Sequence, residues 1–125
     1  MSRLLVDTHA LLWWLTDDPG LPTTARDAIS DPGNEPLVST VSVWEIAIKR
    51  SLGKIDAPGD LPERISEDGF SWLPINARHA WHVRGLPMHH RDPFDRLLVA
   101  QALAERLPVI SGDAVLDAYG VEVRW

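Results

Sequence analysis

Short apolar segments alternate with helix-forming segments along the chain, and this order restricts the fold more than any other feature. The apolar segments are 3–6 (RLLV), 37–40 (LVST), 70–75 (FSWLPI), 107–111 and 121–124. Each is long enough for one strand, and the helical segments between them fit crossover connections rather than hairpin turns. Strands joined through helices pair in parallel and take helices on both faces. The sequence therefore predicts a three-layer α/β/α sandwich with a central, mainly parallel five-stranded sheet.

The helical segments begin and end at residues with matching local preferences. Thr23 or Thr24, Asn76 and Asp92 are suitable N-caps, and Gly53 is suited to end a helix. We expect helices over 8–16, 23–31, 41–53, 61–68, 76–83, from 92 to about 106, and 114–119. The connections 17–22 and 84–91 are expected to be the most flexible parts.

Composition indicates one compact domain over residues 1–125. The chain is 45% hydrophobic and 24% charged, which suffices for a genuine core. No apolar stretch approaches the roughly 18 residues of a membrane span, and the N-terminus does not resemble a signal peptide. The absence of cysteine excludes disulfides and thiolate metal sites, and fits a cytoplasmic protein. The five histidines form no HExxH-like pair, so a zinc site is not expected.

The charge of the chain is acidic, with a formal net charge of −6 and a pI near 5.2. A basic face is typical of nucleic-acid binders, so this balance counts against such a function. The acidic balance counts against nucleic-acid binding only if the acids are spread evenly over the surface. Acids concentrated at one site that holds cations would leave the question of nucleic acid open.

Four acids are expected at one edge of the sheet. Asp7 follows the first strand directly, and Asp113 follows the fourth. Glu45 and Asp95 lie in the first turns of the helices that begin near 40 and 92. In a parallel α/β sheet the helix N-termini and the strand C-terminal ends share one edge, where ligands bind. The sequence thus brings four distant carboxylates toward one place.

Each acid also has an ordinary structural role open to it. Asp7 and Asp113 could cap the helices that follow them. Glu45 could pair with Lys49 one turn later, or complete a capping box with Ser42. Asp95 could cap its helix together with Asp92.

Two observations favour a shared site over four independent caps. Asp95 lies on the same helical face as Leu98, Val99 and Ala102, so it leans toward the buried side. Asp7 ends a buried apolar strand and likewise needs a partner. Carboxylates brought together repel unless they are protonated or bridged by a cation, and hard divalent ions such as Mg²⁺ or Mn²⁺ suit oxygen ligands. A metal site is the interpretation that accounts for all four.

The chain closely resembles the PIN-domain ribonucleases, and most of all the VapC toxins of bacterial toxin–antitoxin pairs. The segments that carry the resemblance are VDTHALLWWL (6–15), VSVWEIAIK (41–49), HRDPFDRLLVAQA (90–102), SGD (111–113) and YGVEVRW (119–125). It runs from Leu4 to Trp125, and the combination of the opening DTH with DPFDRLLVAQA is specific.

The resemblance implies a set of site residues. The metal-binding and catalytic acids fall on Asp7, Glu45, Asp95 and Asp113, while Asp92 is either a further ligand or only the helix cap. Three polar neighbours would orient carboxylates or waters, namely Thr8, Ser42 and Ser111. Arg91 and Arg96 flank the site in sequence and are the arginines we expect at RNA phosphates.

The implied activity is Mg²⁺-dependent endonucleolytic cleavage of RNA, in which Mn²⁺ can replace Mg²⁺. A narrow acidic site suits single-stranded or loop RNA, whose backbone can bend into it. The implied partners are a second copy of the chain, as a homodimer, and a VapB-like antitoxin that fills the acidic pocket. No histidine is required as a base, although His9, His89 and His90 are near enough to the site in sequence to be candidates. The ordinary expectation for them is packing or a solvated loop.

Two other functions remain open from the residues alone. One is a Mg²⁺-dependent α/β phosphatase or phospho-acceptor domain, although VDTH offers a single acid and no lysine follows SGD. The other is a non-catalytic module that uses the acidic pocket to bind a basic partner peptide. Most of the six tryptophans are expected in the core, and an exposed one would suit a protein interface better than base stacking.

Overall fold

A computed structural model describes residues 2–125 as alternating strands and helices. The strands are β1 (Ser2–Val6), β2 (Asn34–Ser39), β3 (Ser71–Leu73), β4 (Val109–Ile110) and β5 (Val123–Arg124). The α-helices are α1 (Thr8–Leu15), α2 (Thr23–Ser30), α3 (Thr40–Ser51), α4 (Leu61–Glu67), α5 (Ala77–His82) and α6 (Pro93–Glu105). Two short 3₁₀ helices are also present, η1 (Val83–Gly85) and η2 (Ala114–Tyr119).

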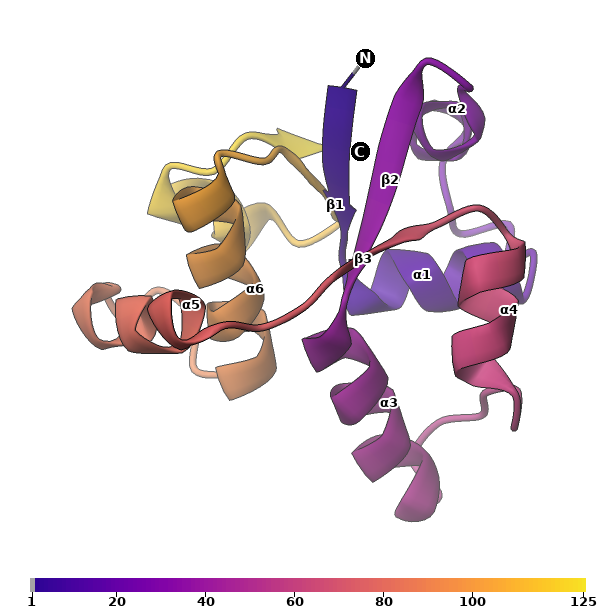
Figure 1. Cartoon of the computed structure of the whole chain (residues 1–125), viewed down its shortest axis with the longest axis horizontal. Coiled ribbons are helices and arrows are strands. Elements are labelled where there is room, and N and C mark those ends of the chain that lie inside the picture. Colours follow the sequence, from indigo (N-terminus) through magenta and orange to yellow (C-terminus); the bar gives the residue numbers. More distant parts are fainter. Residues whose placement is uncertain (1) are drawn as a thin grey trace.

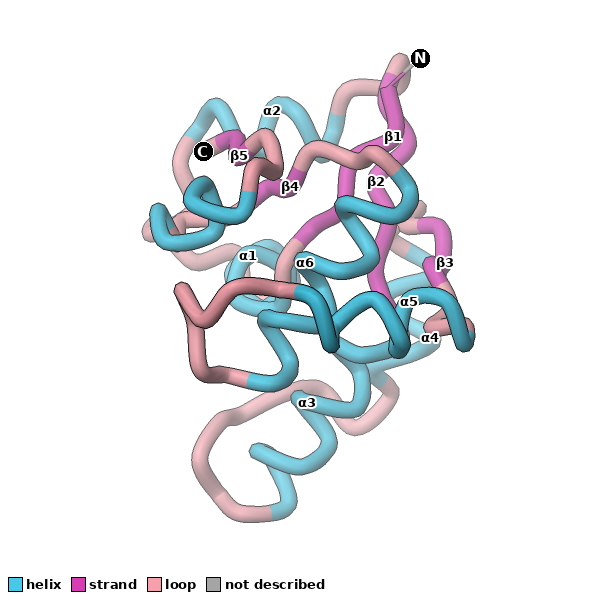
Figure 2. The backbone as a smooth tube through the Cα atoms, turned by 90° about the vertical axis from the view of Figure 1, so that its left-hand side faces the viewer, coloured by secondary structure: helices cyan, strands magenta, loops and turns pink. Residues whose placement is uncertain are grey.

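The five strands form one sheet in the order β3-β2-β1-β4-β5, and every neighbouring pair is parallel. The helices α5 and α6 lie on one side of the sheet, and α1, α2 and α4 lie on the other (Figure 1). Figure 2, turned by 90°, brings α5 and α6 to the near side. The predicted α/β/α sandwich is confirmed, and the sheet is entirely rather than mainly parallel.

Alternate residues of the central strands face different layers, which is why these strands are apolar throughout. Leu4 and Val6 of β1 pack with α1, α2 and α4, whereas Leu5 packs with α6. Ile110 and Val109 of β4 divide in the same way. Burial on both faces holds β1 and β4 rigidly, and the acids that follow them are therefore attached to the most constrained part of the fold.

The helix ends mostly follow the expected residues. Asp92 caps α6 by accepting hydrogen bonds from the backbone of the first turn, with Pro93 at the first helical position. Asn76 forms a capping box with His79 at the start of α5. Gly53, at φ 71°, follows α3 in the left-handed conformation that favours glycine.

Two local predictions need correction. The N-cap of α2 is Pro22 rather than a threonine, and it makes no side-chain hydrogen bond there. Strands β4 and β5 are only two residues long, because β4 pairs with β1 on one side and with β5 on the other over that short register. Segment 114–119 is helical with the predicted bounds, and its helix, η2, is of the 3₁₀ type.

A buried polar network, which the sequence reasoning did not identify, joins α6 to the sheet. The Gln101 side chain accepts a hydrogen bond from Ser39 Oγ and donates to the carbonyl of Leu73 at 3.4 Å. It also contacts His79 Nδ1 at 3.3 Å, and His79 Nε2 donates to Glu105 at 2.8 Å. This hydrogen bond holds the pKa of the Glu105 carboxyl below its usual range. The network links the start of α3, the end of β3 and helices α5 and α6.

The tryptophans do not occupy the core as expected. Trp13, Trp14 and Trp72 are half-buried and pack against it, while Trp44, Trp81 and Trp125 are exposed. The fully buried apolar positions are filled by smaller aliphatic side chains, which fit between closely spaced layers. Of the helices that residues 2–125 form, not one combines the length and apolar character needed to cross a membrane.

Candidate metal centre

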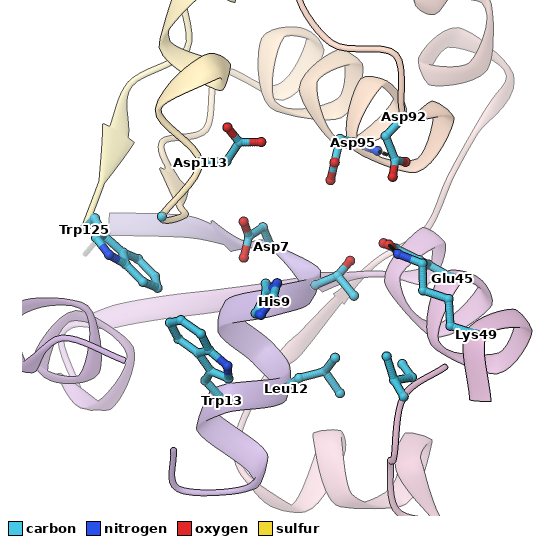
Figure 3. Close-up of a pocket in the computed structure, with 13 residues that line it drawn as sticks. Asp7, His9, Leu12, Trp13, Glu45, Lys49, Asp92, Asp95, Asp113 and Trp125 are labelled. Atoms are coloured by element: carbon cyan, nitrogen blue, oxygen red, sulfur yellow. Dashed lines mark hydrogen bonds and ion pairs between the residues drawn. The ribbon is translucent and has the colours of Figure 1, made fainter. Parts of the chain in front are cut away.

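One pocket, of about 500 Å³, collects the predicted acids at the edge of the sheet. It lies where β1 and β4 end and where α3 and α6 begin, which is the edge that the strand order predicts. Five carboxylates from these four places line it, those of Asp7, Glu45, Asp92, Asp95 and Asp113. Figure 3 shows them around one space, with Trp13 and Trp125 at one side and Lys49 at the other.

Asp7 caps a helix and lines the pocket at the same time. One carboxylate oxygen accepts a hydrogen bond from the backbone of Ala10 at 2.8 Å, so the expected capping role is present. The residue is nonetheless only 7% exposed. Burial raises the pKa of the Asp7 carboxyl, and hydrogen bonds from Ser111 and Ala10 offset part of that rise. A buried acid whose charge is unfavourable is suited to a cationic partner.

Glu45 forms the ion pair that its spacing allows, but with one oxygen only. Lys49 Nζ contacts Glu45 Oε2, and this hydrogen bond raises the pKa of the Lys49 ammonium. Glu45 Oε1 is buried and has no hydrogen-bond partner within residues 2–125. The capping box with Ser42 is not formed, because the N-cap of α3 is Ser39. One carboxylate oxygen of a 4% exposed glutamate is thus available to a ligand in the pocket.

His90 bridges two of the acids, which the sequence reasoning did not anticipate. His90 Nε2 lies 3.0 Å from Asp113 Oδ2 and 3.2 Å from Asp95 Oδ2. Its Nδ1 accepts a hydrogen bond from the backbone N–H of Asp92, so the ring proton is on Nε2. The expectation of ordinary packing or a solvated loop is therefore wrong for His90. The only signal in the sequence is its place two residues before the helix cap.

These three side chains are close enough to share an ion. One potential ligand atom from each of His90, Asp95 and Asp113 lies within 4.8 Å of the other two. With Nε2 protonated, His90 acts as a donor that draws the two carboxylates together. A divalent cation at this position would take over the same role with a greater charge.

Asp95 also has a strongly perturbed carboxyl. Burial and the neighbouring charge of Asp92 raise its pKa to about 7, and Glu45 and Asp7 act in the same direction. The proximity of His90 lowers it in part. A carboxyl whose pKa is raised this far indicates that the protein's own groups do not neutralise the negative charge of this pocket.

The three predicted polar neighbours lie beside the acids. Thr8 Oγ1 donates to Ser42 Oγ at 2.9 Å, which joins the first turns of α1 and α3. Ser111 Oγ accepts from the backbone of Asp113 at 3.0 Å and also bonds the Asp7 carboxyl. All three hydroxyl residues are buried, and Ser111 restricts where the Asp7 carboxylate can point.

The arginines do not take the expected places, and neither Arg91 nor Arg96 lines the pocket. Arg96 is directed at the preceding segment, where its guanidinium donates to backbone carbonyls of 83–90, among them Pro87 at 2.9 Å. The expectation that Arg96 contacts phosphate is corrected accordingly, because its donors are already used to hold this connection. Arg91 is exposed outside the pocket.

The donor set fits a hard divalent ion. Carboxylate oxygens dominate the polar lining, one of them is buried without a partner in the described part of the chain, and two acids have raised pKa values. Mg²⁺ and Mn²⁺ take such oxygen ligands, whereas the zinc sites common in proteins use more nitrogen and sulfur. The residues present therefore fit a metal-binding centre.

Comparison with known proteins gives consistent results. Ribonuclease VapC16 of Mycobacterium tuberculosis is 36% identical over 63 residues, which are 47% of this chain and 45% of that protein. The match thus spans less than half of the length of this curated relative.

Two solved structures share the fold at low sequence identity. VapBC2 of Rickettsia felis, bound to a DNA fragment from its promoter, superposes with a TM-score of 0.71 at 10% identity, covering 98% of this chain and 97% of that chain. A toxin–antitoxin complex from Klebsiella pneumoniae gives a TM-score of 0.68 at 16% identity, with 98% and 96% covered.

The family model of the PIN domain matches residues 4–122. This range includes every acid of the pocket and the strands β2, β3 and β4 in full, together with most of β1. The chain belongs to the PIN domain family.

Proposed function

We propose that this chain is a metal-dependent endoribonuclease whose residues 1–125 act as one nuclease domain, and that it is the toxin of a VapC-type toxin–antitoxin pair. The observation that carries the proposal is the meeting of five carboxylates in one pocket, with Glu45 Oε1 buried and unpartnered within residues 2–125. The family match and the similarity to a protein named Ribonuclease VapC16 give the activity its direction.

Asp7, Asp95 and Asp113 would hold a Mg²⁺ or Mn²⁺ ion, and Glu45 would offer its free oxygen to the ion or to a water. Asp92 keeps its capping role, because one of its oxygens is used by two backbone N–H groups of α6. An ion bound there would activate a water for attack on phosphorus and would neutralise charge on the phosphate. Thr8, Ser42 and Ser111 keep the acids in register.

The narrow pocket suits single-stranded or loop RNA, since a paired backbone cannot bend into it. Among the described residues, no lysine or arginine other than Lys49 lines the pocket, and Lys49 is already paired with Glu45. Binding of a phosphate backbone therefore depends on the ion. This dependence favours a nuclease that is inactive without metal over one that binds RNA through a basic face.

An antitoxin of the VapB kind would silence the enzyme by filling this pocket. A lysine or arginine from such a partner would neutralise the same carboxylates that a metal does, including the unpartnered Oε1 of Glu45 within residues 2–125. Two exposed apolar side chains outside the pocket, Trp44 and Met88, offer contact area for a partner chain and for a homodimer. Light scattering of the purified chain tests the dimer.

The decisive experiment incubates purified protein with mixed RNAs in the presence of Mg²⁺, Mn²⁺ or EDTA. We expect cleavage with either ion, none in EDTA, and none in Asp7→Asn or Asp95→Asn. Asp27→Asn is the matched control, because Asp27 is an exposed acid of α2 outside the pocket.

Cleavage that persists unchanged in the Asp7 and Asp95 variants would indicate a contaminating nuclease and refute the assignment. Phosphate release from small esters, without RNA cleavage, would favour a phosphatase instead. Partner binding without cleavage of any RNA would favour a non-catalytic module.

A further inference from the structure

Part of the lining of the acidic pocket is apolar. Leu12, Trp13, Ile55 and Trp125 line it together with the carboxylates. The rings of Trp13 and Trp125 have centroids 5.9 Å apart at an interplanar angle of 39°, and His9 meets Trp13 edge-on at 4.8 Å. We call His9, Trp13 and Trp125 the aromatic wall, and Figure 3 shows it on one side of Asp7.

The aromatic wall is held by close contacts rather than placed loosely. A Cβ on Gly112 would lie 2.9 Å from Trp125 Cε2, and a Cβ on Gly20 would lie 3.0 Å from Trp13 Cη2. Both rings therefore pack against glycine backbone that leaves no room for a side chain. Trp125 still keeps 39% of its surface exposed. A large aromatic surface is fixed and yet accessible from the pocket.

The wall is connected to the catalytic acids by very short stretches of chain. Gly112, which Trp125 covers, directly precedes Asp113. His9 and Trp13 belong to α1, the helix that Asp7 caps. The aromatic surface and the carboxylates therefore cannot shift far relative to each other.

Charge indicates what the wall can bind. Five carboxylates line the pocket, and Lys49, which also lines it, is paired with Glu45. Within residues 2–125, a second anionic group beside the aromatic wall would therefore find no unpaired lysine or arginine. A flat, uncharged and polarisable group does not face this repulsion. Nucleobases are such groups, and they stack on aromatic side chains without needing a specific sequence.

We propose that the aromatic wall is a base-stacking subsite that holds the base of a nucleotide next to the scissile phosphate. This inference rests on the proposed nuclease function and deepens it. The acids and their ion act on the phosphate, while Trp125, with Trp13, fixes the neighbouring base. The subsite replaces the arginine contacts that this pocket lacks within the described part of the chain.

The test compares Trp125→Ala with Trp125→Phe, which keeps a ring, and with Trp81→Ala, an exposed tryptophan outside the pocket. We expect Trp125→Ala to raise KM for a short single-stranded RNA by roughly ten- to one-hundredfold with kcat nearly unchanged. Trp125→Phe should restore most of the loss, and Trp81→Ala should behave as the wild type. Circular dichroism and thermal melting establish that each variant is folded.

An abasic substrate identifies the base directly. Once the cut position in the RNA is mapped, the nucleotide on each side of it is replaced by an abasic one. For the wild type, one of these two substrates should show the same rise in KM, and Trp125→Ala should no longer distinguish it from the intact RNA. Quenching of tryptophan fluorescence by a nucleoside monophosphate, weaker in Trp125→Ala, gives a readout that does not depend on cleavage.

Unchanged KM and unchanged quenching in folded Trp125→Ala would overturn the subsite and leave the nuclease intact. Weaker binding of an arginine-containing peptide with unchanged RNA kinetics would also overturn it, since the wall would then serve a protein partner. Failure of the wild type to cleave any RNA with metal would refute the proposed function itself, and the subsite with it.

Discussion

Replacing Asp95 with asparagine should make the metal-free protein more stable at neutral and alkaline pH while it abolishes activity. The pKa of the Asp95 carboxyl is raised from 3.8 to about 7, mainly by burial and by the charge of Asp92. A group whose pKa is higher in the folded state stabilises the fold fully below its unfolded pKa, and this contribution is lost as the pH rises through the folded pKa. The wild type should therefore lose stability between about pH 4 and about pH 7.

The size of the effect follows from the shift. At about 1.4 kcal/mol per pKa unit, a rise from 3.8 to about 7 corresponds to roughly 4 kcal/mol. The side chain of Asp95 is 26% exposed, so solvent screens part of this, and about 2 kcal/mol is the reasonable expectation. Asparagine has a similar shape but no charge, so the variant should recover about that amount above neutrality.

Urea unfolding of wild type and Asp95→Asn in EDTA, across the range from about pH 5 to about pH 8, measures the difference. The gap between the two proteins should widen as the pH rises, and Mg²⁺ should narrow it by stabilising only the wild type. Asp27→Asn, at an exposed position of α2, should show no such trend. A wild-type stability that stays flat over this range, or a variant that is less stable at every pH, would refute the reasoning.

Three further changes probe the same pocket. Lys49→Met leaves the buried Glu45 carboxylate without its cation and should cost about 1–3 kcal/mol of unfolding free energy without metal and less with Mg²⁺, by thermal melting. His90→Ala removes the donor that holds two carboxylates together, so calorimetry should show lower stability of the metal-free form and unchanged or tighter Mg²⁺ binding; weaker binding would contradict this. Gly112→Ala should cost about 1–2 kcal/mol in the wild type but clearly less in a Trp125→Ala background, since the new Cβ meets that ring.

The parallel direction of the strands could be predicted because it follows from local patterns, whereas their order in the sheet was not predicted. Apolar runs separated by capped helices leave few alternatives to a parallel sheet. The strand boundaries could not be predicted, because pairing partners determine them. β2 begins at Asn34, in a segment of poor strand formers, since it pairs with β1 from Ser2 onward. Pro36 is tolerated there because β3 pairs with β2 only from Leu37.

The placement of acids at one edge also followed from the sequence, because strand polarity determines which ends meet. The side chains that contact these acids could not be predicted from the sequence. His90 lies in a connection without periodicity, so nothing local indicates that its ring reaches Asp95 and Asp113. Arg96 is close to the site in sequence but is directed at the backbone of the preceding segment. Distances between side chains of different elements depend on packing that a single sequence does not encode locally.

The tryptophans show the same limit. Adjacent positions on a helix predict that Trp13 and Trp14 point in different directions, and they do, toward Trp125 and toward Phe70. Composition could not indicate that one of these directions is the pocket. The glycines that the rings of Trp13 and Trp125 cover give only a weak signal, because a glycine in a loop far more often marks a turn than a ring packed against the backbone.

The buried Gln101 side chain has a consequence for which ions can be accepted. By bonding Ser39 at the start of α3 and Leu73 at the end of β3, it fastens α6 to the strands beside it. The helices that carry Glu45 and Asp95 are thereby held at a set separation before any ion arrives. Carboxylates held at a fixed separation discriminate between ions by ionic radius. Mg²⁺, with oxygen distances of about 2.1 Å, and the slightly larger Mn²⁺ should therefore bind better than Ca²⁺, whose oxygen distances are about 2.4 Å.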